Sequence, residues 1–298
     1  MQEKLYLAFD IGGTAIKYGI ITENGNFLYH SQFPNLIREE GVERMLQDIT
    51  ATAKNMQSQY ELQAIGLSTS GVVDMKTGEM LRPADTFPGY KGKYPGRLLT
   101  EATGLPCHVD NDVNCAVLGE YHFGAAQGRS PVCCMAVGTG IGGATLIDGR
   151  LFYGATYFAG EIGHFPVPGG ELEKVASTYA LVKRVAAAKN MSEQQVNGKQ
   201  IFAWAQAGDA ISIAAINDMM KTLAQGMVYL LYAFNPQIII LGGAIAAQEA
   251  YLRPLLMEHL QRLVIPELLE NTEIAFSQLN NTASMLGTVS PYLKPDKA

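Results

Sequence analysis

The sequence predicts an α/β protein made of two similar domains with a cleft between them. Its 298 residues exceed what one hydrophobic core usually fills, since domains hold about 100–200 residues. Short apolar strands alternate with helical patterns in both halves, which is typical of sheets covered by helices. One order of elements also occurs twice: strand, glycine-rich turn, strand, second turn with Gly, strand.

In the first half, apolar runs predict buried strands over Leu5–Phe9 and Ile16–Ile21, because both are too short for helices. Asn24-Gly25 is a strong hairpin signal, so the chain is expected to return as a strand over Phe27–Phe33. Apolar residues at helical spacing predict a helix over Glu39–Gln57.

The elements that follow are shorter. We expect a strand over Ala64–Ser68, a helix over Pro95–Thr103 and a strand over Cys107–Val109. A helix is expected to open at Asp110-Asn111-Asp112 and to run through Tyr121. Residues 75–97 are rich in Gly and Pro and have no clear period, which indicates loop and short strands.

The second half repeats the opening order. A strand over Val132–Val137 leads into the glycine-rich Gly138–Gly143, and a second strand is predicted over Ala144–Ile147. Asp148-Gly149 forms the turn, and Leu151–Tyr153 is the expected return strand.

The rest of this half is mostly helical in pattern. Helices are predicted over Val175–Lys189 and Ala210–Phe234, and a closing helix over Ala283–Tyr292. Between them, Ile238–Leu241 reads as a buried strand that ends in a turn at Gly242-Gly243.

Composition excludes several classes of protein. A chain with 48% hydrophobic and 17% charged residues is not disordered. A net charge of −6 argues against overall electrostatic binding to nucleic acid or anionic lipid. The longest apolar stretch, 238–247, is shorter than the roughly 20 residues of a membrane span, and the start lacks signal-peptide features. The four Cys show no CxxC spacing, so we expect buried thiols and a cytoplasmic protein without nucleic-acid or membrane partners.

Two glycine-rich segments suggest phosphate binding. Gly138–Gly143 fits G-x-G-x-x-G, but a dinucleotide site needs a helix after the glycines, whereas here a strand follows. A hairpin tip that offers backbone N–H groups to a phosphate fits better. Asp10–Thr14 has the same form, with an added carboxylate and hydroxyl. Tight turns alone are the alternative, but two such segments in matching places favour phosphate.

The ordered set of motifs resembles the ROK family of bacterial sugar kinases. The resemblance runs from about Leu5 to Tyr292 and is carried by Asp10–Thr14 with Lys17 and Gly19, Gly138–Gly143, Gly160–His164 and Leu241–Gly243. It implies the actin/Hsp70/hexokinase-like fold, with two duplicated ribonuclease-H-like domains and ATP in the cleft between them. It also implies Mg²⁺-dependent phosphorylation of a sugar hydroxyl by ATP. We expect residues 1–115 with about 283–298 in one lobe and 116–282 in the other.

By this resemblance, both hairpins hold ATP phosphates and a glycine pair flanks the adenosine. The ATP-binding residues expected are Asp10, Gly12, Gly13, Thr14, Lys17, Gly138, Thr139, Gly140, Gly142, Gly143, Gly242 and Gly243. Asp10 is expected to orient Mg²⁺ through water, because one strand-end carboxylate suits a partly hydrated cation. A tight turn explains Gly242-Gly243 equally well.

Asp110-Asn111-Asp112 supplies the candidate general base. A carboxylate with a reference pKa of about 3.9 is ionised at neutral pH and can accept a sugar hydroxyl proton. Capping of the following helix is the alternative, and it accounts for one of the three residues. The family motif is Asn-Asp, which implies Asn111 as a sugar contact and Asp112 as the base, rather than Asp110.

Further polar residues match the family's sugar-binding segments. The resulting set is Gly71, Asn111, Asp112, Glu161, His164 and Glu173. Without the resemblance, Glu173 would be an ordinary Glu in the first turn of a helix, and a lone His is more often structural. Ser70 stands where the family motif has Pro.

The chain departs from many family members after His164. Residues 165–171 contain no Cys where a Cys-rich zinc loop is common, and one His cannot form a four-ligand site. We therefore expect no structural zinc. Glucose, fructose, N-acetylmannosamine and a β-glucoside all stay open as substrates, and a homodimer is implied by the family. The alternatives are a non-catalytic sugar sensor or a sugar-responsive transcriptional regulator. The start of the phosphate hairpin within about ten residues of Met1, and the presence of both Asp10 and Asp112, argue against them.

Overall fold

The computed structural model describes residues 3–293, and the chain divides into two compact units. Of the described residues, the first unit holds 3–127, 153–158 and 281–293, and the second holds 128–152 and 159–280. The expected boundary at residue 115 differs from this division, because helix α3 (Asp112–Phe123) runs unbroken past it. Segment 153–158 also groups with the first unit, which the sequence did not suggest.

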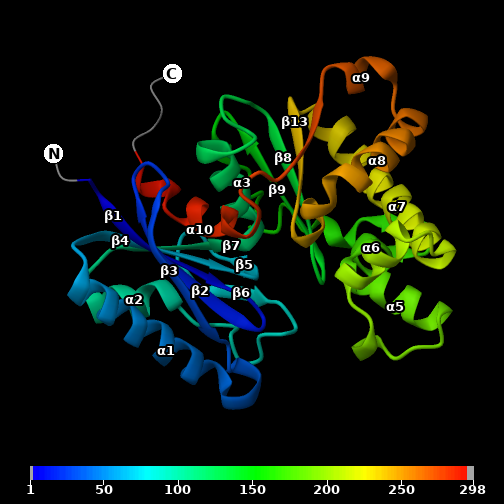
Figure 1. Ribbon diagram of the computed structural model, residues 1–298. Coiled ribbons are helices and arrows are strands. Elements are labelled where there is room, and N and C mark those ends of the chain that lie inside the picture. The colour runs from blue at the N-terminus through cyan, green and yellow to red at the C-terminus, as the bar shows by residue number, and fades with distance from the viewer. Residues whose placement is uncertain (1–2, 294–298) are drawn as a thin grey trace. The chain divides into compact units, whose positions relative to one another are not determined.

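The first unit is built on a five-stranded sheet of order β3-β2-β1-β4-β7 (Figure 1). The strands are β1 (Leu5–Ile11), β2 (Ala15–Thr22), β3 (Phe27–Pro34), β4 (Leu62–Thr69) and β7 (Cys107–Asn111). The first three form an antiparallel meander, whereas β4 and β7 run parallel to β1. The apolar runs are buried in the structure, which confirms the strands expected from them.

Helices cover both faces of this sheet. Leu7 and Phe9 of β1 share a core with α1 (Ile37–Gln59) on one face, beside α2 (Pro95–Thr103). On the opposite face α10 (Ala283–Thr288) packs against Gly66 of β4 and against α3. Figure 1 shows α1 and α2 on one side of the strands and α10 on the other. A short hairpin of β5 (Gly71–Val73) and β6 (Met80–Pro83) follows β4.

The second unit repeats this topology. Its sheet has the order β10-β9-β8-β13-β14, with strands β8 (Val132–Val137), β9 (Ile141–Ile147), β10 (Arg150–Leu151), β13 (Ile238–Gly242) and β14 (Glu273–Phe276). Again two antiparallel strands lie on one side of the central strand and two parallel strands on the other. The duplication expected from the sequence is therefore confirmed.

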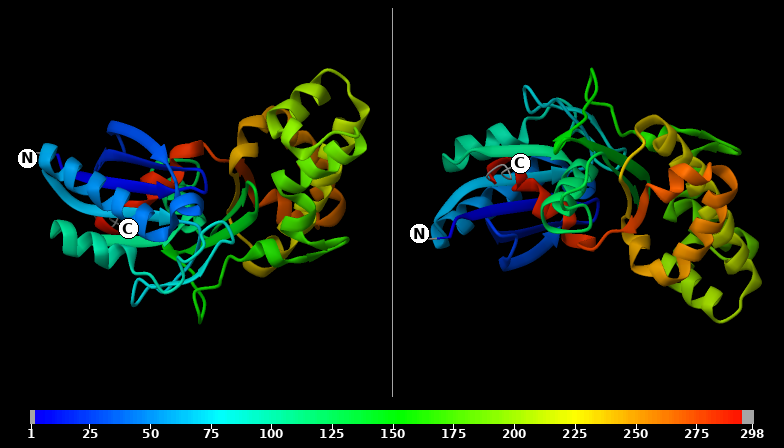
Figure 2. Two further views of the ribbon diagram at one scale, coloured as in Figure 1. Left: turned by 90° about the horizontal axis from the view of Figure 1, so that it is seen from below. Right: turned by 90° about the horizontal axis from the view of Figure 1, so that it is seen from above.

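The second unit carries a larger set of helices on its sheet. They are α4 (Leu172–Ala176), α5 (Thr178–Ala188), α6 (Gly198–Gln206), α7 (Ala210–Phe234), α8 (Glu249–Leu263) and α9 (Pro266–Glu270). Met135 and Leu241 lie in one core with buried residues of α4 to α8. Figure 2 shows these helices gathered beside the strands of their own unit.

Several expected elements differ in extent from the structure. Strand β9 begins at Ile141 and not at Ala144, so Gly142 and Gly143 lie in the strand rather than in the turn. The single helix over Val175–Lys189 is broken at Ser177, whose side chain caps α5 by accepting a hydrogen bond from the Ala180 N–H. The closing helix ends at Thr288 and continues only as a 3₁₀ turn, Ser290–Tyr292, which begins just before a proline. The return strand stops at Leu151, and the residues after Phe152 leave the second sheet.

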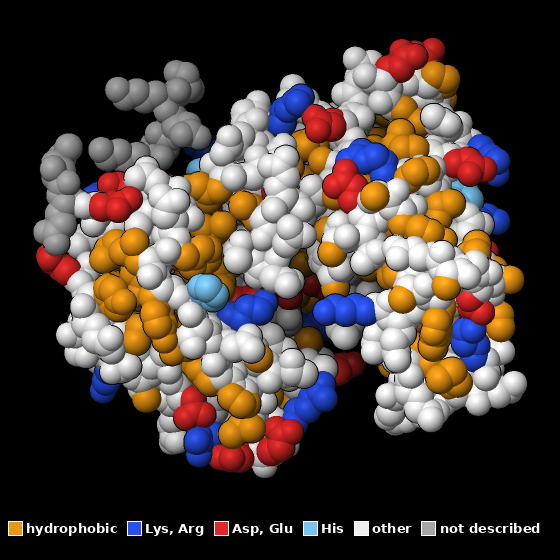
Figure 3. Space-filling view, in the orientation of Figure 1, with side chains coloured by type: hydrophobic (Ala, Val, Ile, Leu, Met, Phe, Trp, Pro, Cys, Tyr) orange, Lys and Arg blue, Asp and Glu red, His pale blue; other side chains and the backbone are white. Residues whose placement is uncertain are grey.

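The surface of the described residues is mixed in character. Hydrophobic side chains reach it over β3 (Figure 3), where Leu28 and Tyr29 are exposed. Within residues 3–293, no helix is both long and apolar enough to span a membrane.

Candidate active site

Strand register places three polar residues in one row at the carboxyl ends of the first sheet. Asp10 of β1 pairs with Ser68 of β4, and Ser68 pairs with Asp110 of β7. Since these strands are parallel, the residues that follow each of them leave the sheet at the same edge. This edge is the usual place for ligand sites in open α/β sheets.

Asp10 of the first hairpin is held by one donor from β4 and one from β2. The Ser68 hydroxyl donates to Asp10 Oδ1 at 3.0 Å, and Lys17 Nζ lies 3.0 Å from Oδ2. The Asp10 side chain is 13% exposed and that of Lys17 is 37% exposed, so the carboxylate end of this ion pair is shielded from water and the ammonium end is not. The adjoining tip, Gly12–Thr14, is fixed by Asn35, whose amide donates to Gly12 O and whose N–H donates to Thr14 O.

The contacts of Asp10 suit the role expected for it with Mg²⁺. Mg²⁺ prefers hard oxygen ligands, keeps several waters and is often bound by one or two carboxylates together with substrate phosphates. Asp10 offers one such carboxylate, and the ammonium group of Lys17 lies 3.0 Å from its Oδ2. Ser68 and Asn35 were missed in the sequence. The parallel register of β4 with β1 is the signal that identifies Ser68.

Asp112 is the first residue of α3, and its carboxylate is oriented by a distant serine. Ser70 donates to Asp112 Oδ2 at 2.7 Å, and the N–H of Val113 donates to Oδ1 at 3.0 Å. The Ser284 hydroxyl donates to the Asp112 backbone oxygen at 3.1 Å. The carboxylate therefore has a defined orientation, as a positioned base requires.

Asn111 is the residue that caps α3. Its side-chain oxygen accepts hydrogen bonds from the N–H groups of Val113 and Asn114, and its amide donates to Gly71 O at 3.0 Å. Because an amide nitrogen carries two hydrogens, one N–H is left over from the Gly71 contact. Capping and a sugar contact are therefore compatible in Asn111, and Asp112 is not needed as the cap.

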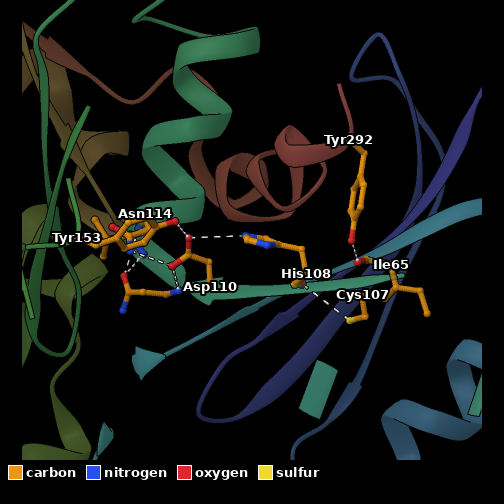
Figure 4. Close-up of polar contacts among 9 residues, drawn as sticks. Ile65, Cys107, His108, Asp110, Asn114, Tyr153 and Tyr292 are labelled. Carbon is orange, nitrogen blue, oxygen red and sulfur yellow. Dashed lines mark hydrogen bonds and ion pairs between the residues drawn. The ribbon is translucent and has the colours of Figure 1, made fainter. Parts of the chain in front are cut away.

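Asp110 has a different environment from Asp112. It is 1% exposed and accepts hydrogen bonds from Tyr153, Asn114 and the Asn111 N–H (Figure 4). A carboxylate buried and bonded in this way is poorly placed to take a proton from a sugar. The geometry thus favours Asp112 over Asp110 as the base.

Cys115 lies close to the carboxylates of Asp10, Asp110 and Asp112. Burial raises the pKa of its thiol well above the usual value, and the charges of Asp110, Asp112 and Asp10 raise it further. The thiol therefore stays protonated and neutral at physiological pH. Its burial, like that of Cys133 and Cys134, agrees with the expectation for the cysteines, whereas Cys107 is only half-buried. The place of Cys115 near three acidic residues was not visible in the sequence.

In the second unit, the hairpin Gly138–Gly143 and the segment Gly160–His164 pack tightly together. The Gly143 N–H donates to Gly160 O at 2.7 Å. A Cβ at Gly160, where φ is +98°, would collide with Gly143 O, and a Cβ at Gly143 would lie 2.7 Å from Ile162 Cδ1. Gly160 is thus required by the close approach of two backbone segments, whereas Gly143 leaves room for the Ile162 side chain. Thr139 and Gly140 lie between the two strands of this hairpin, and Gly142 lies within β9.

Glu173 lies against both of these segments. A Cβ at Gly140 would be 2.9 Å from Glu173 Oε2, and one at Gly163 would be 3.2 Å from the same atom. Lys174 Nζ is 2.9 Å from Glu173 Oε1. His164 Nδ1 lies 3.4 Å from Glu171 Oε1. The Glu173 carboxylate therefore lies next to Gly163, one residue before His164.

A two-stranded hairpin follows His164, in the segment where the resemblance led us to expect that a zinc loop is missing. It consists of β11 (Pro166–Val167) and β12 (Gly170–Glu171) and is closed by the Leu172 N–H donating to Phe165 O at 2.9 Å. Within residues 3–293, no group of three or more His, Cys, Asp or Glu residues could hold a metal ion. The expected lack of zinc stays a prediction for metal analysis.

Gly242 and Gly243 end strand β13. Gly243 has a φ of +82°, and a Cβ there would collide with Val137 O at the end of β8. The close approach of two strand ends thus explains Gly243 without a ligand. A contact of this pair with adenosine is not tested by the geometry.

Comparison with known proteins identifies the class of protein to which this fold and these motifs belong. The model of the ROK family matches residues 6–293, so the chain belongs to the ROK family. A protein of Clostridium perfringens is 37% identical over 283 residues, covering 95% of this chain and 96% of that protein.

Other relatives carry names that state an activity. A glucokinase of Halalkalibacterium halodurans is 28% identical, with 96% of this chain and 94% of the relative covered. A beta-glucoside kinase of Listeria innocua is 29% identical, with 97% of each chain covered. The crystal structure of a ROK family glucokinase from Streptomyces griseus, in complex with glucose and AMPPNP, matches with a TM-score of 0.83 at 27% identity. That match covers 95% of this chain and 97% of the other.

Proposed function

We propose that this protein is an ATP-dependent sugar kinase that phosphorylates a hydroxyl of a hexose or a hexose derivative. The observation that carries the proposal is the pair Asn111-Asp112 at the start of α3, with the Asp112 carboxylate held by Ser70 and the Asn111 amide held by Gly71. The relatives named glucokinase and beta-glucoside kinase support the same class of reaction.

Asp112 acts as the general base in this proposal. Its carboxylate accepts the proton of the attacking sugar hydroxyl as the oxygen bonds to the γ-phosphorus of ATP, and ADP leaves. Ser70 keeps one carboxylate oxygen fixed, so that the proton acceptor does not rotate away from the hydroxyl. Asn111 donates its remaining amide N–H to a sugar oxygen. Such positioning supplies much of the rate in phosphoryl transfer.

The remaining groups are assigned to binding. Backbone N–H groups of the Asp10 and Gly138 hairpins hold phosphate oxygens, and Lys17 offsets their charge. Mg²⁺ at Asp10, bound through water, would neutralise charge on the phosphates during transfer. The polar side chains Glu161, His164 and Glu173 hold sugar hydroxyls.

A screen of ADP release tests the proposal and selects the substrate. Purified protein with ATP and Mg²⁺ is assayed with glucose, fructose, N-acetylmannosamine and a β-glucoside in parallel. We expect rapid ADP release with at least one sugar and its loss in Asp112→Asn. Binding of a sugar without turnover of any of them would favour the non-catalytic sensor instead.

A further inference from the structure

Asp110 is a buried carboxylate that the proposed reaction leaves unused. Its oxygens are within hydrogen-bond distance of three donors: the Tyr153 hydroxyl at 2.7 Å, the Asn114 amide at 2.9 Å and the Asn111 N–H at 2.7 Å. His108 Nε2 lies farther away, at 3.8 Å (Figure 4). A carboxylate that is 1% exposed is tolerated only with such a set of partners, because burial of an unpaired charge is costly.

Two of the three donors belong to the junction of β7 and α3, which carries the base. The Asn111 N–H is part of the peptide between Asp110 and Asn111, one residue before Asp112. Asn114 lies in the first turn of α3. Asp110 therefore fixes the orientation of the backbone from which Asp112 projects.

The third donor comes from a segment far along the chain. Tyr153 opens the segment 153–158, which groups with the first unit, although the residues on both sides of it, 128–152 and 159–280, form the second unit. The expected sugar segment, Gly160–His164, begins two residues after Phe158. The Tyr153 hydroxyl thus links the stretch that precedes Gly160–His164 to Asp110, two residues before the base Asp112.

Tyr153 is a permanent donor in this pair. Burial raises the pKa of its hydroxyl well above the usual value, and the charge of Asp110 and the hydrogen bond to it raise the pKa further. The hydroxyl therefore keeps its proton throughout the working pH range. Its ring packs edge-on against that of Tyr157, with the centroids 6.2 Å apart.

We propose that Asp110 and Tyr153 are positioning residues for the general base Asp112. The Tyr153 hydroxyl holds Asp110 Oδ2, and Asp110 Oδ1 in turn holds the Asn111 peptide and the first turn of α3. Without the hydroxyl, the buried carboxylate turns toward other donors and the peptide before Asp112 shifts with it. This inference rests on the proposed kinase function, and it adds a residue pair that does not touch the substrate.

Tyr153→Phe tests the pair because it removes one oxygen and keeps the ring. We expect kcat to fall about ten- to a hundredfold, since small displacements of a catalytic group cost up to that order. Affinities for ATP and sugar, measured at equilibrium, and the Tm should stay near the wild-type values. A merely structural role would lower the Tm and leave the kcat of the folded protein unchanged.

Two further variants complete the test. Tyr157→Phe removes a hydroxyl from the same segment that has no hydrogen-bond partner among the described residues, so its kcat should match the wild type. Asp110→Asn should reproduce the loss in kcat, and Tyr153→Phe should cost little more in that background, because both act through one contact.

The outcomes separate this inference from the proposed function. A wild-type protein without sugar-dependent ADP release would refute the kinase itself. With an active wild type, the inference is overturned if Tyr153→Phe matches Tyr157→Phe in kcat. It is also overturned if the losses from Tyr153→Phe and Asp110→Asn simply add, or if Tyr153→Phe fails to fold or loses only stability.

Discussion

Asp112→Asn is the substitution that separates chemistry from folding most cleanly in this site. The amide has nearly the shape of the carboxylate, and the Ser70 hydroxyl, 2.7 Å from Oδ2, can rotate to accept from an amide N–H instead of donating. The cap of α3 is Asn111 and stays in place. We therefore expect the free energy of unfolding to change by less than about 1 kcal/mol.

The effect on turnover should be far larger. A positioned general base contributes about 10²–10⁴-fold, and kcat should fall by that order. At about 1.36 kcal/mol for each factor of ten, this equals about 2.7–5.4 kcal/mol of barrier. Because only the proton acceptor is lost, the equilibrium affinity for sugar should stay close to that of the wild type.

The assay is coupled ADP release at saturating ATP and sugar, with the Tm measured on the same preparations. Asp218→Asn, which changes an exposed carboxylate on α7, is the matched control and should behave as the wild type. Turnover of Asp112→Asn within about threefold of the wild type would show that Asp112 is not the base. A large drop in Tm would show that the carboxylate is needed for folding.

Three further predictions concern Ser70, the dependence of ATP turnover on sugar, and zinc. Ser70→Ala should lower kcat by up to about tenfold, because the hydrogen bond to the base is lost, and Ser70→Thr should restore most of it; equal kinetics in all three proteins would contradict the role of Ser70. ATP turnover should be slow without sugar and rise strongly with the right one, because closing on sugar excludes water and aligns the hydroxyl; equal rates with and without sugar would point to another member of the fold. The purified protein should hold no stoichiometric zinc, and zinc-selective chelators should leave activity intact when Mg²⁺ is present; about one tightly held zinc per chain would refute this.

Local pattern determined most of the framework of this protein. The strand Val132–Val137 and the helix Ala210–Phe234 have the bounds predicted from the sequence. The spacing of apolar residues and the residues that end an element are properties of neighbouring positions, so they can be recognised without the tertiary structure. The repeated order of strand, glycine turn and strand also predicted the duplicated sheets, which the structure confirms. The glycine-rich hairpins follow from the same local information.

Some elements were missed, and one of them carries a clear local signal, since Asn197 and Gln200 form a capping box at the start of α6. Helices α6 and α8 and the edge strand β14 were not predicted. The break at Ser177 was missed because a helical period continues on both sides of it, while capping by the Ser177 hydroxyl depends on the backbone conformation there.

The division of roles among Asp110, Asn111 and Asp112 was decided by tertiary structure. The three side chains are neighbours of nearly the same chemistry, and the family motif alone ranked them in the sequence. In the fold, Asp110 accepts a hydrogen bond from Tyr153, Asn111 donates one to Gly71 O, and Asp112 accepts one from Ser70. These partners lie about 40 residues away along the chain, and local pattern carries no information on contacts at that separation. The physical reason is that burial and hydrogen bonding, which set what a carboxylate can do, depend on which distant segments meet it.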